Sequence, residues 1–271
     1  MLAIKPVCWL PALTLLTSYL PPTLALPLNM TDSDPSTSPP SPPSFPAHQT
    51  YPLVEPLNIA VLLFPAFQAL DVFGPLDALN ILSQTIPLNL HILASTLSPV
   101  STKPLTLTTR SNFSESVVPT HTFDSPPSDI DVLLVPGGLG TRSPDIGPLV
   151  DFIATTYPKV QYMITVCTGS WLAARAGVLD GRRATSNKRS WAGRLEYGSD
   201  NVKWVAKARW VVDGNVWTSS GVSAGIDATL DWIKFVWGEE RARMVADGME
   251  YDWHTDASWD PFAELYGLKD E

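Results

Sequence analysis

From residue 57 onward, short apolar runs alternate with longer segments that have helical periodicity. The first run, Asn58–Phe64, is apolar at nearly every position and is bounded by prolines, which is typical of a strand buried on both faces. Similar runs predict strands at 88–94, 131–135 and 161–166. Helices are predicted at 71–83, 145–157, 169–177, 223–237 and 239–248. This alternation predicts an α/β fold with a mostly parallel sheet covered on both faces.

Two segments add β structure outside this alternation. The threonine-rich stretch 100–110 predicts a small β excursion. Residues 203–218 predict a β-hairpin that turns at Asp213-Gly214, because Asp-Gly between two apolar runs favours a tight turn.

The composition changes before residue 57. Lys5 precedes an apolar segment and Ala25 completes a small-residue cleavage pattern, so residues 1–25 are interpreted as a signal peptide. The apolar segment is too short and too interrupted by proline for a stable membrane span. Residues 26–56 are rich in proline, serine and threonine, which predicts a disordered linker. We therefore expect a secreted or secretory-pathway protein, or a cytoplasmic one if the N-terminus is not a signal.

Glycosylation sequons and net charge bear on the partners of the chain. Asn29 and Asn112 begin Asn-x-Thr and Asn-x-Ser sequons, which makes them candidate glycosylation sites. The net charge of −9 argues against a nucleic-acid partner, since phosphate binding needs clustered Lys and Arg. A small-molecule substrate is the partner we expect.

Cysteine is the most informative residue type. The chain has two, and one, Cys8, lies inside the predicted signal, so the mature chain would hold a single thiol and no internal disulfide. That thiol, Cys167, follows the strand 161–166 and precedes the helix 169–177, in the manner of a nucleophile elbow. The helix N-terminus is expected to lower the thiol pKa. We favour a nucleophile or redox sensor over an inert core residue.

Two further features are expected at the same sheet edge. Asp71 follows the first strand, where it would either cap a helix or, beside the thiol, have a raised pKa and donate a proton. Gly137 and Gly138 follow the strand 131–135, where their N–H groups could bind substrate or stabilise developing negative charge. No metal site is predicted.

Several segments together resemble the ThiJ/PfpI superfamily of class I glutamine-amidotransferase-like proteins. They are Leu70-Asp-Val-Phe-Gly-Pro75, Val135-Pro-Gly-Gly138, Val166-Cys-Thr-Gly169, Leu179–Thr185 and Ser219–Asp227. The resemblance covers residues 57–245 and implies a flavodoxin-like three-layer sandwich with a small β-hairpin excursion. It also implies a homodimer. Residues 246–271 remain as a C-terminal tail, expected to pack on the domain or on a partner subunit.

An aspartate in the first loop, together with Cys-Thr-Gly at the elbow, is similar to the isonitrile hydratase branch. The resemblance implies a hydro-lyase that adds water to an isonitrile and gives an N-substituted formamide. Cys167 would be the nucleophile, Asp71 the acid and base, and Thr168 a hydroxyl neighbour that shapes the pocket. No metal or organic cofactor is implied. Candidate residues for the pocket wall are Trp171, Trp191 and Trp217.

Two alternatives remain. Other branches place a histidine twenty positions after the elbow, where this chain has Asn187, and asparagine cannot act as a general base. This substitution disfavours a glyoxalase or deglycase acting on reactive carbonyls, which is the first alternative. The second is a non-enzymatic redox sensor in which Cys167 is oxidised to a sulfinic acid.

Overall fold

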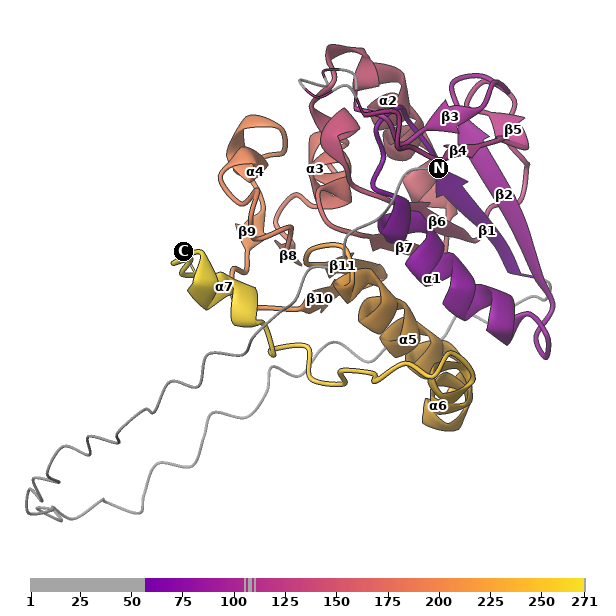
Figure 1. Ribbon diagram of the computed structural model, residues 1–271, viewed down its shortest axis with the longest axis vertical. Helices are drawn as coiled ribbons and strands as arrows, with labels where there is room; N and C mark the ends of the chain where they lie inside the picture. The colour runs from indigo at the N-terminus through magenta and orange to yellow at the C-terminus, as the bar shows by residue number, and fades with distance from the viewer. Residues whose placement is uncertain (1–56, 105, 107–108, 110, 271) are drawn as a thin grey trace, which may run out of the picture. The chain divides into compact units, whose positions relative to one another are not determined.

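A seven-stranded sheet forms the centre of the computed structural model, which describes residues 57–104, 106, 109 and 111–270 (Figure 1). Its strand order is β10-β11-β7-β6-β1-β2-β5, and every neighbouring pair is parallel except β10 with β11. The strands are β1 (Leu57–Leu62), β2 (Leu88–Ala94), β5 (His121–Thr122), β6 (Val132–Val135), β7 (Tyr162–Thr165), β10 (Trp210–Asp213) and β11 (Val216–Ser219). The predicted mostly parallel α/β class is confirmed.

Two groups of helices cover the sheet. One group consists of α1 (Ala69–Leu82), α5 (Ala224–Trp237) and α6 (Glu239–Gly248), which pack on one another. The other pairs α2 (Gly147–Thr156) with α3 (Gly169–Arg175), and Figure 1 shows the sheet running between the two groups. Shorter helices are η1 (Leu139–Arg142), η2 (Pro144–Ile146), η3 (Tyr157–Lys159), α4 (Gly193–Glu196) and α7 (Pro261–Leu265).

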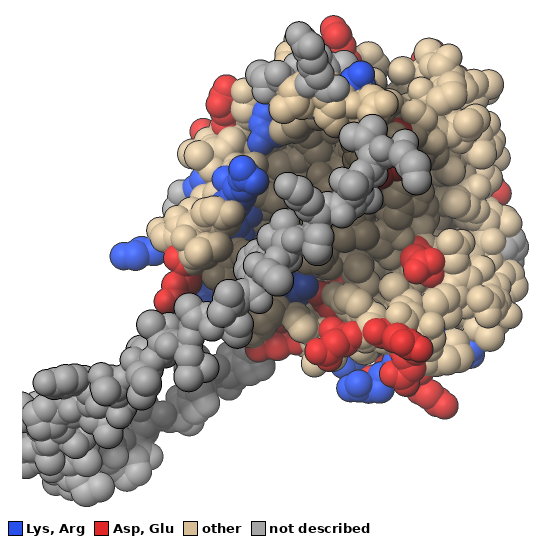
Figure 2. All heavy atoms as spheres, in the orientation of Figure 1, with Lys and Arg blue, Asp and Glu red and all other residues tan. Residues whose placement is uncertain are grey.

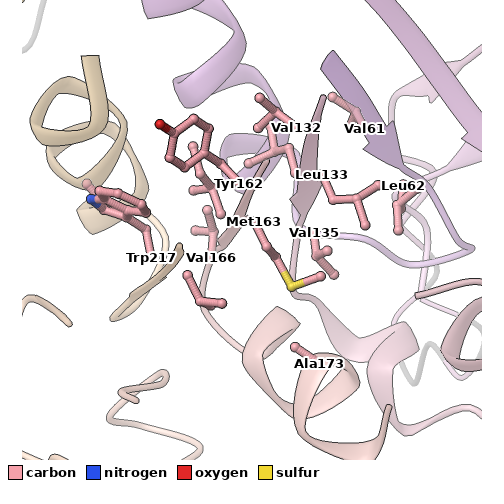
Figure 3. Close-up of a cluster of buried hydrophobic side chains, with 14 of the residues drawn as sticks. Val61, Leu62, Val132, Leu133, Val135, Tyr162, Met163, Val166, Ala173 and Trp217 are labelled. Carbon is pink, nitrogen blue, oxygen red and sulfur yellow. The ribbon is translucent and has the colours of Figure 1, made fainter. Parts of the chain in front are cut away.

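The core lies where the central strands meet these helices (Figure 3). All six residues of β1 and all four of both β6 and β7 are buried, as their continuous apolar sequences predict. Each fully buried large apolar side chain contributes roughly 1.5–3 kcal/mol by leaving water. Side chains labelled in Figure 3 are Val61, Leu62, Val132, Leu133, Val135, Tyr162, Met163, Val166, Ala173 and Trp217.

The two β additions are smaller than the sequence predicts. The hairpin turns at Asp213-Gly214 as expected, but it contains only β10 and β11. Lys203–Trp204 instead forms β9, which pairs in parallel with β8 (Arg183–Ala184) and so cannot extend the hairpin. The excursion predicted at 100–110 is β structure only at Val100–Ser101 (β3), paired with Ser116–Val117 (β4).

The segment after α6 lies along the α/β domain. The His254 N–H donates to a buried carboxylate oxygen of Asp227, and the carbonyl of Ala257 accepts from the Arg209 N–H at 2.7 Å. Near the end of the chain an Asp270 carboxylate oxygen accepts from the Ala206 N–H. These bonds hold the segment against its own domain, while the predicted partner subunit and homodimer remain predictions.

Some predictions concern residues that the structure does not describe, or a modification that it does not test. The predicted signal peptide 1–25, the linker 26–56 and the sequon at Asn29 lie outside the described residues. Asn112 is exposed in the connection between β3 and β4, and its glycosylation remains a prediction. Within the described part of the chain, every helix is too short or too polar to cross a membrane.

Candidate active site

Cys167 lies at a strained turn between β7 and α3. Its φ is +60°, in the left-handed region that residues with a side chain rarely adopt. The Cys167 N–H donates to the carbonyl of Ser220 at 2.9 Å, and the hydroxyls of Ser170 and Ser186 both donate to the Cys167 carbonyl at 3.1 Å. Both backbone polar groups of Cys167 thus have hydrogen-bond partners, which hold the turn in place.

Tight packing behind the elbow requires a glycine. A Cβ on Gly169 would lie 2.2 Å from the carbonyl oxygen of Val135, so only glycine lets the start of α3 approach β6 this closely. Two other non-glycine residues near this sheet edge, Ala66 and Val222, also have positive φ. Such strain gathers at functional sites when surrounding contacts enforce it.

Asp71 faces the elbow from the first turn of α1. Its side chain is fully buried, and Oδ2 accepts a hydrogen bond from the Gly137 N–H at 2.9 Å. Burial raises the pKa of Asp71 to about 7, while hydrogen bonds from the Gly137 N–H and the Cys167 thiol partly oppose the rise. Within the described residues Oδ1 is buried without a hydrogen-bond partner. The helix-cap alternative is therefore wrong, because this carboxyl bonds to the β6 loop and Gln68 is the N-cap of α1.

The thiol of Cys167 is a poorer acid than the sequence predicts. Burial, followed by the charge of Asp71, raises the pKa of Cys167 to about 12. Hydrogen bonds from the N–H groups of Val222 and Thr168 and from the Asn187 side chain only partly oppose this rise. The expectation that the helix N-terminus lowers the thiol pKa is wrong, because desolvation outweighs it. Cys167 therefore rests as a thiol beside a carboxyl group that can accept its proton.

Asn187 contacts the sulfur directly. Its Nδ2 donates to Cys167 Sγ at 3.2 Å, and its Oδ1 accepts from the Ser190 N–H at 2.9 Å, which fixes the orientation of the amide. A Cβ on Gly221 would lie 2.8 Å from Asn187 Nδ2, so the glycine leaves room for this side chain. Sequence analysis singled out position 187 only because asparagine cannot act there as a general base. It did not predict that Asn187 donates a hydrogen bond to the sulfur.

The glycine loop after β6 holds the site together. The Gly137 N–H donates to Asp71, and the Gly138 N–H donates to Thr168 Oγ1 at 3.0 Å. Thr168 also lies 3.2 Å from the hydroxyl of Thr141. A Cβ on Gly137 would lie 2.5 Å from the Thr168 nitrogen. Both glycine N–H groups therefore have protein partners. These two amides position the acid and the threonine, and the oxyanion or substrate-binding role of Gly137 and Gly138 remains a prediction.

A cavity of about 240 Å³ is lined by Asn187, whose Nδ2 contacts the Cys167 sulfur, while Cys167 and Asp71 are not among its lining residues. Two of its lining residues come from the C-terminal segment, and no sequence pattern indicated them. The lining residues are Asn187, Lys188, Arg189, Ser220, Gly221, Val222, Ser223, Phe262 and Tyr266. None of the three tryptophans proposed for the wall is among them, because all are buried in the core: Trp171, Trp191 and Trp217.

Charges on the face shown in Figure 2 are divided between two sides. Most Lys and Arg side chains on this face lie on the side of α4, and Asp and Glu side chains are most numerous toward α6. Across residues 57–104, 106, 109 and 111–270, no group of three or more His, Cys, Asp or Glu side chains is placed to hold a metal ion.

A thiol at a strained strand-to-helix elbow, beside a buried carboxyl on a parallel sheet, defines a cysteine-centred α/β protein. The chain belongs to the DJ-1/PfpI family, whose model matches residues 57–234, and this confirms the superfamily resemblance. It is similar to the isonitrile hydratase of Pseudomonas putida, with 35% identity over 201 residues, 72% of this chain and 78% of that protein.

Two further comparisons place the chain within this family. It is 34% identical over 121 residues to a deglycase of Pyrococcus horikoshii, covering 42% of this chain and 68% of that protein. The crystal structure of a ThiJ/PfpI family protein from Pseudomonas syringae matches with a TM-score of 0.58 and 28% identity, covering 73% of this chain and 76% of that one. The flavodoxin-like fold is thereby confirmed.

Proposed function

We propose that this protein is an isonitrile hydratase-like hydro-lyase, which converts R–N≡C and water into the formamide R–NH–CHO. The observation that carries the proposal is the pairing of the Cys167 thiol with an Asp71 carboxyl whose pKa is about 7. A group with this pKa can both accept and return a proton near neutral pH. The similarity to the Pseudomonas putida isonitrile hydratase supports the same chemistry.

In the first half of the reaction, the Asp71 carboxylate accepts the thiol proton as sulfur attacks the terminal isonitrile carbon. Asp71 then delivers that proton to the same carbon, which gives the thioimidate R–N=CH–S–Cys167. Oδ1 is the oxygen free for this transfer, because Oδ2 accepts from the Gly137 N–H. The amide of Asn187, 3.2 Å from Sγ, stabilises the negative charge that develops on sulfur.

In the second half, Asp71 removes a proton from water as the water oxygen attacks the thioimidate carbon, and the nitrogen receives that proton. The tetrahedral intermediate R–NH–CH(OH)–S–Cys167 then collapses. The carbon–sulfur bond breaks, the hydroxyl proton returns through Asp71 to sulfur, and R–NH–CHO leaves. One water is consumed, and both the thiol and the carboxylate are regenerated.

The test measures formamide formation from cyclohexyl isocyanide by the full chain and by two variants. Cys167→Ser is expected to reduce the rate to background, because an alcohol buried beside Asp71 is a far weaker nucleophile. Asp77→Asn, on the exposed side of the same helix as Asp71, is the matched control and should keep the full rate. Formamide production by Cys167→Ser at the unaltered rate would refute the assignment.

A carbonyl-directed activity is the second candidate, because the chain is also similar to the Pyrococcus horikoshii deglycase. Asn187 occupies the position beside sulfur where that chemistry calls for a base, and an amide cannot accept a proton there. Conversion of methylglyoxal to lactate, lost in Cys167→Ser, would establish this activity instead. The redox-sensor alternative would be established instead by a stable gain of two oxygens at Cys167 in intact-mass measurements after mild peroxide treatment.

A further inference from the structure

One side of the cavity that Asn187 lines is formed by a helix from the far end of the chain. Phe262 and Tyr266, on α7 and just after it, line the same cavity as Asn187, whose amide contacts the sulfur. Both aromatic side chains remain nearly half exposed, at 45% and 44%. Partly exposed aromatic side chains that line a cavity are suited to contact an apolar ligand.

A buried ion pair fixes this helix to the site. Lys188 Nζ lies 3.2 Å from Asp260 Oδ2, and each side chain is only 1% exposed. The other oxygen, Asp260 Oδ1, caps α7 by accepting from the Phe262 N–H at 2.8 Å and the Ala263 N–H at 3.2 Å. Lys188 directly follows the residue that contacts the sulfur.

The anchor also reaches the elbow itself. Asp260 Oδ2 accepts from the Ser220 hydroxyl at 3.3 Å, and the Ser220 carbonyl accepts from the Cys167 N–H. Lys188 completes its shell by donating to Thr185 Oγ1 and to the Ala208 carbonyl. A five-residue helix is not stable alone in water, so these bonds determine where α7 lies.

The cavity selects ligands by size and polarity. Its volume of about 240 Å³ falls below the roughly 300–1,000 Å³ of drug-sized ligand sites. Val222 adds apolar surface to the lining, which also includes the exposed Arg189. A compact apolar group fits this space better than an extended or charged chain.

We propose that α7 is the specificity wall of the site, where Phe262 and Tyr266 contact a compact cyclic or aryl group of the isonitrile. Asp260 and Lys188 are positioning residues that hold this wall against the elbow. The inference rests on the proposed function, which supplies the isonitrile as the reacting group. The lining of the cavity supplies the class of the substituent R.

The first experiment compares cyclohexyl isocyanide with methyl isocyanide on the full chain. Phe262→Ala is expected to lower kcat/KM for the cyclohexyl substrate about tenfold or more, mainly through KM, and to change it about twofold or less for the methyl substrate. Asp260→Asn keeps a capping side chain but loses the charge, and should shift selectivity in the same direction. The matched control is Leu265→Ala, on the same helix, 69% exposed and outside the cavity.

The second experiment does not depend on turnover. Mass spectrometry follows the alkylation of Cys167 by iodoacetamide and by N-cyclohexyl iodoacetamide, and the ratio of the two rates is compared between proteins. We expect the wild-type preference for the cyclohexyl reagent to fall in Phe262→Ala and Tyr266→Ala, and to persist in Leu265→Ala. If both aromatic variants kept or increased the preference for the cyclohexyl reagent, the proposal that α7 forms the specificity wall would be refuted. Absence of isonitrile turnover in the wild type, with the alkylation preference behaving as expected, would overturn the proposed function alone.

Discussion

Replacing Asp71 with asparagine should strongly reduce catalysis and yet stabilise the fold at neutral and alkaline pH. In wild type the pKa of this carboxyl rises from its ordinary 3.8 to about 7 on folding, chiefly through burial. Below pH 3.8 the carboxyl is protonated in both the folded and the unfolded chain, and its full contribution to the free energy of unfolding is present. As the pH rises toward 7 only the unfolded chain releases the proton, so that contribution is progressively lost.

The loss is large on the scale of protein stability. At about 1.4 kcal/mol for each tenfold change in proton affinity, the difference between 3.8 and about 7 corresponds to about 4 kcal/mol. Asparagine is neutral at every pH and can still accept the Gly137 N–H, so Asp71→Asn escapes this loss. The variant should therefore exceed the stability of wild type at pH 8 by several kcal/mol, and by little at pH 4.

Urea unfolding at pH 4, 6 and 8 measures the difference, with Asp77→Asn as the control on the same helix. Asp77 is exposed, and its substitution should leave the free energy of unfolding within about 0.5 kcal/mol of wild type at each pH. Formamide production by Asp71→Asn should fall by about 10²- to 10⁴-fold. A stability difference that does not grow with pH, or a variant less stable than wild type at pH 8, would refute the argument from burial.

Two further substitutions test the supports of the site. Gly137→Ala places a Cβ 2.5 Å from the Thr168 nitrogen. It should lower the free energy of unfolding by about 1–3 kcal/mol in thermal or urea unfolding and remove most of the activity. Gly147→Ala is the control, since a Cβ there would have nothing within 4 Å, and it should change neither stability nor activity. Lys188→Met leaves the Asp260 carboxylate buried without its cation and should cost ~3–5 kcal/mol in urea unfolding. Adding Asp260→Asn should restore most of that stability, whereas additive losses in the double variant would contradict a direct ion pair.

Most of the fold could be predicted from the sequence, because the central strands are apolar at nearly every position and their composition indicates burial on both faces. Asn58–Phe64 is apolar nearly throughout, and the strand found there is buried at every position. The start of the hairpin could not be predicted in the same way. Lys203 pairs with a strand twenty residues earlier in the chain instead of joining the hairpin. Strand pairing is a tertiary contact, and local propensity does not determine it.

The site was accessible in part for a topological reason. Asp71, Gly137 and Cys167 each follow a strand, and the carboxyl ends of parallel neighbours meet at one edge of a sheet. The direction of the Cys167 pKa change could not be predicted, because it depends on how deeply the folded chain buries the thiol. The contribution of Phe262 to the cavity was likewise invisible, because the ion pair that places its helix joins Lys188 to a residue 72 positions later.

The left-handed backbone at Cys167 bears on any attempt to engineer this scaffold. A side chain in that conformation costs roughly 1–3 kcal/mol, which glycine does not incur. Among thiol-free variants, Cys167→Gly should therefore retain more stability than Cys167→Ala, although both are inactive. A designer who wants only a robust α/β framework would replace this residue first, whereas one who wants the reaction must accept a less stable protein.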